Sequence, residues 1–244
     1  MILDTIHSRK TEGRKQLALL LDPDRLTDRA LENLAGLAEQ EGVDYLFVGS
    51  SLLTHNRLEE TIATVRRITK LPLVLFPGNP LQISPAADAL LLLSLVSGRN
   101  PEMLIGRHVI AAPYLKESGL EVIATAYMLI ESGKPTAALY MSDSHPIPAD
   151  QPDIALCTAM AAEMLGMKMV YLDAGSGAEK PVSEEMIRSV RQGIALPLIV
   201  GGGIRSGEAA LRACKAGADL IVVGNAAEKN AGLLAEILSA VSSC

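Results

Sequence analysis

Three apolar segments in the last third of the chain each end in glycine, and each is followed by a helical pattern. They span residues 171–177, 196–206 and 218–225. Glycine has no Cβ, so the backbone can turn sharply there and approach a ligand closely. The N–H groups at the start of each following helix point outward, with the positive end of the helix dipole behind them. Three such turns at successive strand ends, late in the chain, predict the phosphate site of a (β/α)8 barrel.

Length and composition fit one such barrel. The chain has 244 residues, 49% of them apolar, and no Gly/Ser-rich linker divides it, so we expect a single domain over residues 1–244. No apolar run reaches 18 residues, and the N-terminus lacks the apolar stretch of a signal peptide. These features predict a cytoplasmic protein with at most peripheral membrane contact. The three cysteines, Cys157, Cys214 and Cys244, are widely spaced, which indicates reduced thiols rather than a zinc site.

The net charge of −6 argues against nucleic acid as the main partner. It is compatible with an anionic substrate, because a bound metal ion and a local group of N–H donors can reverse the field around a site.

Apolar runs and helical patterns alternate along the chain. Strands are predicted at residues 15–22, 44–49, 71–77, 88–95, 121–130, 169–174, 196–201 and 219–224. Helices are predicted from Thr27-Asp28 onward and then at residues 56–69, 102–108, 152–165, 183–192, 207–216 and 227–241. This alternation predicts a parallel sheet covered by helices.

Two connections depart from the simple repeat. Residues 78–87 leave only ten positions, two of them proline, between the third and fourth strands. A parallel crossover normally needs about a dozen residues or more, so we expect the third helix to be missing or degenerate and one side of the barrel wall to be open. Residues 131–150 are predicted to form a functional loop or lid after the fifth strand.

Asp22 and Ser51 lie at the ends of the first two predicted strands. These ends are neighbours at the same mouth of a barrel. A carboxylate and a hydroxyl that face a diphosphate suit Mg²⁺, which keeps waters and shares substrate oxygens. The alternative is that Asp22 only caps the turn before Pro23.

Asp173 follows Tyr171 by two residues in the sixth predicted strand, so both side chains point to the same side. A carboxylate beside a phosphate site would repel the phosphate, and we therefore predict that Asp173 binds a substrate hydroxyl. The alternative is an acid at the edge of the core that caps the next turn.

With these residues in place, the chain strongly resembles the geranylgeranylglyceryl phosphate synthase family, which includes the bacterial heptaprenylglyceryl phosphate synthases. The motifs that carry the resemblance are at residues 21–24, 48–52, 76–78, 171–177, 201–204 and 224–225. The family joins sn-glycerol 1-phosphate to a polyprenyl diphosphate through an ether bond, with Mg²⁺, and its members are often homo-oligomers. The resemblance implies that Asp22 and Ser51 hold the metal and that Asp173 and Tyr171 are catalytic. It assigns glycerol 1-phosphate to Tyr171, Leu172, Asp173, Ala174, Gly175, Ser176, Gly177, Gly202, Gly203, Gly224 and Asn225.

The chain departs from the family pattern at two positions. Asp173 stands where many members have Glu, and Ser50 stands where a second glycine is usual, which leaves open whether Ser50 or Ser51 meets the metal. The bacterial heptaprenyl type carries a Lys two residues before the first-strand Asp. Leu20 stands there in this chain, which places it closer to the geranylgeranyl type.

The prenyl tail needs a long apolar groove. We expect its walls to come from the open third-unit side, from residues 90–95 and from residues 124–127 of the fifth strand. About half of these side chains must instead face the core, because strand residues alternate faces.

Two other classes of protein fit the three glycine turns. One is an isomerase or lyase acting on a sugar phosphate, and residues 122–126 count against it because they offer no acid or base across the mouth. The other is a barrel that only binds a phosphometabolite. Asp22 and Asp173 argue against that class, since a binder gains little from acids near phosphate.

Overall fold

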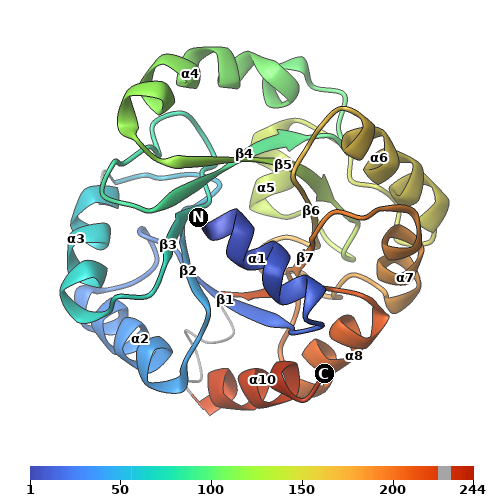
Figure 1. Ribbon diagram of the computed structural model, residues 1–244. Coiled ribbons are helices and arrows are strands. Elements are labelled where there is room, and N and C mark those ends of the chain that lie inside the picture. Colours follow the sequence, from blue (N-terminus) through green and yellow to red (C-terminus); the bar gives the residue numbers. More distant parts are fainter. Residues whose placement is uncertain (56, 225–231) are drawn as a thin grey trace.

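The computed structural model describes residues 1–55, 57–224 and 232–244, and its strands form one closed parallel barrel in the order β1 to β8 (Figure 1). The predicted (β/α)8 fold is confirmed. The strands are β1 (Gln16–Leu21), β2 (Tyr45–Val48), β3 (Leu73–Leu75), β4 (Ala89–Leu95), β5 (Glu121–Leu129), β6 (Met169–Asp173), β7 (Leu198–Gly201) and β8 (Leu220–Val223).

Helices surround the barrel in the described part of the chain. They are α1 (Ile2–Thr11), α2 (Asp28–Glu41), α3 (Leu58–Ile68), the π-helical segment η1 (Glu102–Gly106), α4 (Arg107–Ser118), α5 (Ala137–Ser142), α6 (Pro152–Met164), α7 (Glu184–Gly193), α8 (Gly207–Ala216) and α10 (Gly232–Ser242). None of the described helices is long and apolar enough to cross a membrane.

Side-chain hydroxyls fix where several helices begin. Thr27, Ser183 and Ser206 each accept a hydrogen bond from the backbone N–H three residues ahead, at the start of α2, α7 and α8. Such caps satisfy N–H groups that have no partner within the helix. The predicted start of α2 at Thr27-Asp28 is therefore confirmed.

Alternating strand residues divide the core into two layers. In β6, Val170 and Leu172 pack outward against the helices, while Met169 and Tyr171 point into the barrel. This is the period of two expected for a strand. Asp173 lies on the same side as Tyr171, as the sequence predicted, and the structure shows that this side faces the barrel interior.

No helix connects β3 to β4, as predicted, and residues 76–88 cross there as turns. Two other predictions need correction. The helix predicted at 102–108 continues through α4 to Ser118 because Gly119 supplies the left-handed residue that ends it. The predicted loop 131–150 contains the short helix α5, begun by Thr136, whose hydroxyl accepts a hydrogen bond from Leu139 N–H.

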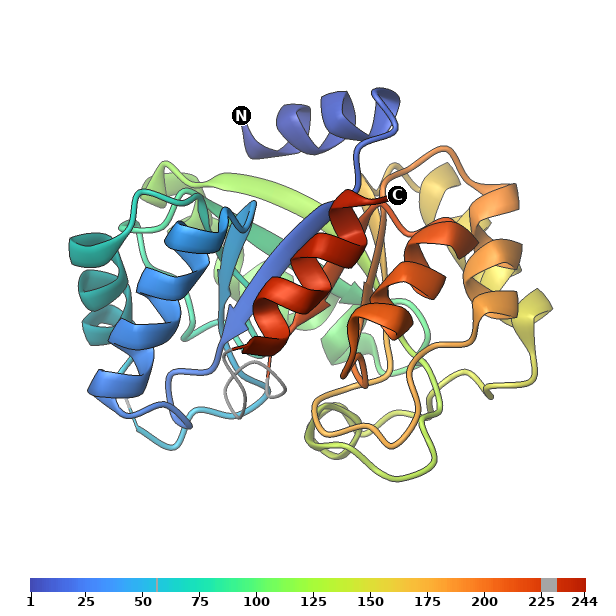
Figure 2. The same cartoon turned by 90° about the horizontal axis from the view of Figure 1, so that it is seen from below.

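The sequence analysis did not predict α1. This helix lies across the end of the barrel where the strands begin, opposite the loops that follow the strands (Figures 1 and 2). Ile6 plugs the interior from α1, and Glu121 of β5 accepts hydrogen bonds from the N–H groups of Ile2 and Leu3. The weak amphipathic pattern of α1 gave no clear signal, because its inward face is little more than one buried side chain.

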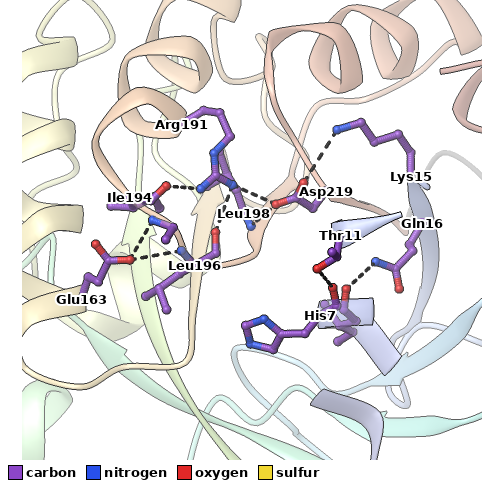
Figure 3. A network of polar contacts seen from close by, with 12 residues as sticks. His7, Thr11, Lys15, Gln16, Glu163, Arg191, Ile194, Leu196, Leu198 and Asp219 are labelled. Carbon is purple, nitrogen blue, oxygen red and sulfur yellow. Dashed lines mark hydrogen bonds and ion pairs between the residues drawn. The ribbon is translucent and has the colours of Figure 1, made fainter. Parts of the chain in front are cut away.

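Buried acids at this base are paired with cations (Figure 3). Asp219 accepts from Arg191 at 2.9 Å and from Leu198 N–H at 2.9 Å, and Lys15 Nζ lies 3.7 Å away. Asp44 similarly bonds Arg9 at 2.6 Å and Arg14 at 3.0 Å. These contacts neutralise charge that would be costly to bury alone.

Candidate active site

The mouth opposite α1 holds the three glycine turns. Four of their glycines have positive φ: Gly175 (88°), Gly177 (77°), Gly202 (79°) and Gly203 (71°). A Cβ at Gly202 would lie 2.5 Å from Gly175 N and 2.7 Å from Asp173 Oδ1. The turns after β6 and β7 therefore approach each other at a distance that only glycine permits.

The other predicted residues of this phosphate site have simpler positions. Leu172 and Ala174 turn their side chains into the outer core, so only their backbone belongs to the mouth. Gly224 follows β8, and Asn225 lies outside the described residues. Assignment of glycerol 1-phosphate to these residues stays a prediction.

Asp173 is buried at the centre of the mouth. Its Oδ2 accepts from the Tyr127 hydroxyl at 2.6 Å, and its Oδ1 accepts from Gly175 N–H at 2.7 Å. Burial raises the pKa of Asp173 above its usual value, while the two hydrogen bonds act to lower it. Asp173 therefore caps the next turn through Oδ1, as the alternative interpretation predicted. Its Oδ2 instead bonds the Tyr127 hydroxyl, which is not part of that turn.

The sequence analysis placed Tyr127 in the wall of the groove but missed its contact with Asp173. Residues 122–126 of the fifth strand offer no acid or base, and Tyr127 follows directly after them. The alternation that places Ile123 inward also places Tyr127 inward. In the barrel, Tyr127 is paired in register with Tyr171. Burial, together with the nearby Asp173 carboxylate, raises the pKa of both tyrosines well above 10.

Aromatic rings connect this acid to the open side of the barrel. Phe76 stacks on Tyr171 with ring centroids 5.4 Å apart and meets the edge of Tyr127 at 5.7 Å. Phe47 lies beyond Phe76 at 6.5 Å. The cluster forms an apolar floor between Asp173 and the segment that replaces the third helix.

Asp22 lies across the mouth, at the end of β1. Its Oδ2 accepts from the Ser50 hydroxyl at 3.0 Å, its Oδ1 accepts from Asp24 N–H at 3.0 Å, and Arg25 Nε lies 3.3 Å from Oδ2. Burial raises the pKa of Asp22, partly offset by these contacts. The serine that touches Asp22 is thus Ser50, while Ser51 lines the adjoining groove.

That groove occupies the side of the barrel that lacks a helix. It is open to solvent, and its volume available to water-sized molecules is about 100 Å³. Its walls are residues of 76–83, β4, the inner face of α4 and α5, among them Phe76, Ile83, Leu93, Met103, Leu115, Tyr127 and Met141. The predicted walls from the open side, from β4 and from Tyr127 of β5 are therefore found together in one apolar groove, whereas residues 124–126, also predicted, do not line it.

Comparison with known proteins identifies the family of this chain. Residues 9–242 match the model of the PcrB family. The chain belongs to this family.

Relatives from bacteria and archaea are similar to this chain over nearly its whole length. A geranylgeranylglyceryl phosphate synthase of Chitinophaga pinensis is 52% identical over 98% of this chain and 95% of its own length. One of Korarchaeum cryptofilum is 46% identical over 94% of this chain and 93% of its own length. The resemblance predicted from the motifs is confirmed.

A solved member of the family has nearly the same architecture. The (S)-3-O-geranylgeranylglyceryl phosphate synthase of Thermoplasma acidophilum, crystallised with sn-glycerol-1-phosphate, superimposes with a TM-score of 0.94 at 34% identity. The match covers 100% of this chain and 99% of that one. Mycobacterium tuberculosis tryptophan synthase, at 16% identity and a TM-score of 0.63, shares the fold alone.

Proposed function

We propose that this PcrB-family protein is a prenyltransferase that joins sn-glycerol 1-phosphate to geranylgeranyl diphosphate by an ether bond and releases diphosphate. The observation that carries the proposal is the near-complete match to a synthase crystallised with sn-glycerol-1-phosphate. The mouth adds the parts that such a reaction needs: a cradle for phosphate, a buried acid and an apolar groove.

The acceptor binds at the turns after β6 to β8 in this proposal. Backbone N–H groups of the glycine turns hold its phosphate, and the Asp173 carboxylate lies beside them to accept a hydrogen bond from the glycerol hydroxyls. Fixing both ends of the acceptor makes the encounter with the donor effectively intramolecular.

The donor places its tail in the groove and its diphosphate near Asp22. Asp22, Ser50 and Ser51 offer only oxygen donors, which fits Mg²⁺. No cluster of three or more His, Cys, Asp or Glu side chains occurs among the described residues, so the substrate and water would complete the shell. When bound there, Mg²⁺ would supply positive charge that makes diphosphate a better leaving group.

In the reaction, the bond between C1 of the prenyl chain and the diphosphate oxygen breaks, and the glycerol hydroxyl oxygen bonds to C1. The hydroxyl proton passes to a carboxylate oxygen of Asp173. Tyr127 holds that carboxylate in place through its 2.6 Å hydrogen bond. The raised pKa of buried Asp173 makes it a stronger base than a solvated aspartate.

The direct test is to incubate the purified protein with sn-glycerol 1-phosphate, Mg²⁺ and labelled farnesyl, geranylgeranyl or heptaprenyl diphosphate. We expect an ether-linked product and free diphosphate, with geranylgeranyl diphosphate the best donor. sn-Glycerol 3-phosphate is the matched control acceptor and should react poorly. Absence of product from all three donors would refute the proposal. Equal activity with and without excess EDTA would refute the proposed requirement for Mg²⁺.

Assembly as a homo-oligomer and a cytoplasmic location stay predictions. Light scattering of the full chain at several concentrations tests the first. Fractionation of the source cells tests the second.

A further inference from the structure

The segment that replaces the third helix carries two fully buried polar side chains, Gln82 and Ser84. The Ser84 hydroxyl donates to Glu59 of α3, whereas Gln82 reaches the mouth. Its Nε2 donates to Ser50 O at 2.7 Å, and its Oε1 accepts from Ser50 N–H at 3.1 Å. The nitrogen and the oxygen of the Gln82 amide therefore both bond the backbone of Ser50. That residue lies at the mouth, next to Asp22.

These bonds extend the strand ladder past its end. Phe76 N–H of the neighbouring strand edge donates to Val48 O at 2.8 Å. Two residues farther along, at Ser50, the amide of Gln82 takes the place of a peptide group of the neighbouring strand. At this half-buried position, the hydrogen bonds from Gln82 give the Ser50 N–H and C=O protein partners, and leaving such groups unpaired away from water costs free energy.

Two glycines allow the segment to come this close. A Cβ at Gly49 would lie 1.9 Å from Phe76 O, and a Cβ at Gly78 would lie 2.3 Å from Ser50 O. Close backbone approach on both sides leaves residue 50 little freedom to move, and Gln82 supplies the polar contacts within that confined space.

We infer that Gln82 is a positioning residue: its amide fixes the backbone of Ser50 and so holds the Ser50 hydroxyl toward Asp22, where the donor diphosphate is proposed to bind. The inference rests on the proposed function. The chain of contacts runs from Gln82 to the Ser50 backbone, and from the Ser50 hydroxyl to Asp22 Oδ2 at 3.0 Å.

The same segment also lines the groove proposed to hold the prenyl tail. Pro77, Pro80 and Ile83 line the groove from the stretch that presents Gln82. Loss of the third helix therefore opens the wall for an apolar chain and brings an amide to the diphosphate end of that chain. The backbone groups of a helix at this place would bond one another. The segment instead presents the Gln82 amide to the Ser50 backbone.

The chain contains a matched control at the opposite end of the barrel. Gln16, labelled in Figure 3, is also fully buried. Its Oε1 accepts from the Tyr45 hydroxyl at 2.8 Å, and its Nε2 donates to Ile6 O. A purely structural glutamine should behave like Gln16. A positioning glutamine should add an effect confined to the donor end.

The experiment compares Gln82→Met and Gln16→Met in the full chain by thermal unfolding with added ligands. The probes are Mg²⁺ with inorganic diphosphate, and separately sn-glycerol 1-phosphate. Both variants should melt lower than the wild type without ligand. In Gln82→Met, the Mg²⁺ concentration that gives half of the diphosphate-dependent stabilisation should rise about 10–100-fold, the scale of losing a residue that orients metal ligands. Gln16→Met should keep the wild-type value, and stabilisation by sn-glycerol 1-phosphate should be unchanged in both.

Gln82→Asn covers the case in which Gln82→Met does not fold. It keeps the amide but is one methylene too short to grip both Ser50 groups, so it should shift the Mg²⁺ requirement in the same direction. If the folded Gln82 variants need the same Mg²⁺ concentration as the wild type, the positioning role of Gln82 is refuted, while the proposed function is not. A wild-type protein that Mg²⁺ and diphosphate do not stabilise would refute the proposed metal–diphosphate site and the inference with it.

Discussion

At the base of the barrel, Asp44 and Asp219 are each paired with two cations, whereas at the mouth Asp173 has a tyrosine hydroxyl and a backbone N–H. No described Lys, Arg or His forms an ion pair with Asp173. All three carboxylates are buried. The comparison shows that burial alone does not distinguish Asp173 from the two acids at the base, whereas the absence of a paired cation does.

The largest expected effect separates these two classes of acid. Asp173→Asn keeps the shape and one acceptor but loses the charge and the basicity. We expect turnover to fall about 10²–10⁴-fold, the usual contribution of a general base, with phosphate binding retained because repulsion is relieved. Asp173→Glu should be milder. Steady-state rates at saturating prenyl diphosphate check this, and an Asn variant as active as the wild type would make Asp173 a structural cap.

At the other side of the mouth, Asp22→Asn should leave folding intact and lower turnover about 10²-fold or more, as for loss of a main electrostatic stabiliser. The Michaelis constant for sn-glycerol 1-phosphate should stay near the wild-type value, since β8 separates β1, which carries Asp22 at its end, from the glycine turns after β6 and β7. Full activity of this variant would show that Asp22 only caps its turn.

The base acid should respond in the opposite way. Asp219→Asn leaves Arg191 and Lys15 without their carboxylate, which should lower the free energy of unfolding by about 3 kcal/mol. Turnover per folded molecule should change little. Urea denaturation and active-site-normalised rates test this together, and a large loss of turnover with unchanged stability would break the distinction between the two ends.

Alanine substitution of one glycine at each end of the barrel also compares the mouth with the base, with a smaller expected effect. Gly203 at the mouth and Gly166 at the base both have positive φ, but a Cβ would meet Pro181 N at 2.8 Å only at Gly203. Alanine at either site carries a similar backbone strain of about 1 kcal/mol. Only Gly203→Ala should raise the Michaelis constant for sn-glycerol 1-phosphate, by roughly tenfold, a change of about 1.4 kcal/mol in binding. Equal constants in the two variants would count against the phosphate assignment.

The smallest effect concerns stability and pH. The folded-state pKa of Asp173 is raised above its unfolded value, so the folded state binds more protons between those two values. The free energy of unfolding contributed by this group therefore falls as pH rises from about 4 through the raised pKa, by about 1.4 kcal/mol per unit of difference. Asp173→Asn should remove this loss, so its stability relative to the wild type should be greater at pH 7 than at pH 4. Urea denaturation at both values tests this, and a constant difference would contradict the burial argument.

The sequence by itself determined the barrel, the missing third helix, the positive-φ glycine turns and the shared strand face of Tyr171 and Asp173. Each follows from a local rule: strand periodicity, crossover length and the conformational freedom of glycine. The same rules could have indicated Tyr127, since it continues the inward face of β5.

Only the tertiary structure decided which residues meet across the mouth. Asp22 contacts Ser50 rather than Ser51, and Gln82 reaches back 32 positions to hold that serine. The helix α1 is placed by Glu121, which lies more than a hundred residues away. Such contacts depend on how strand ends and loops are juxtaposed in three dimensions, and no periodicity along the chain encodes them.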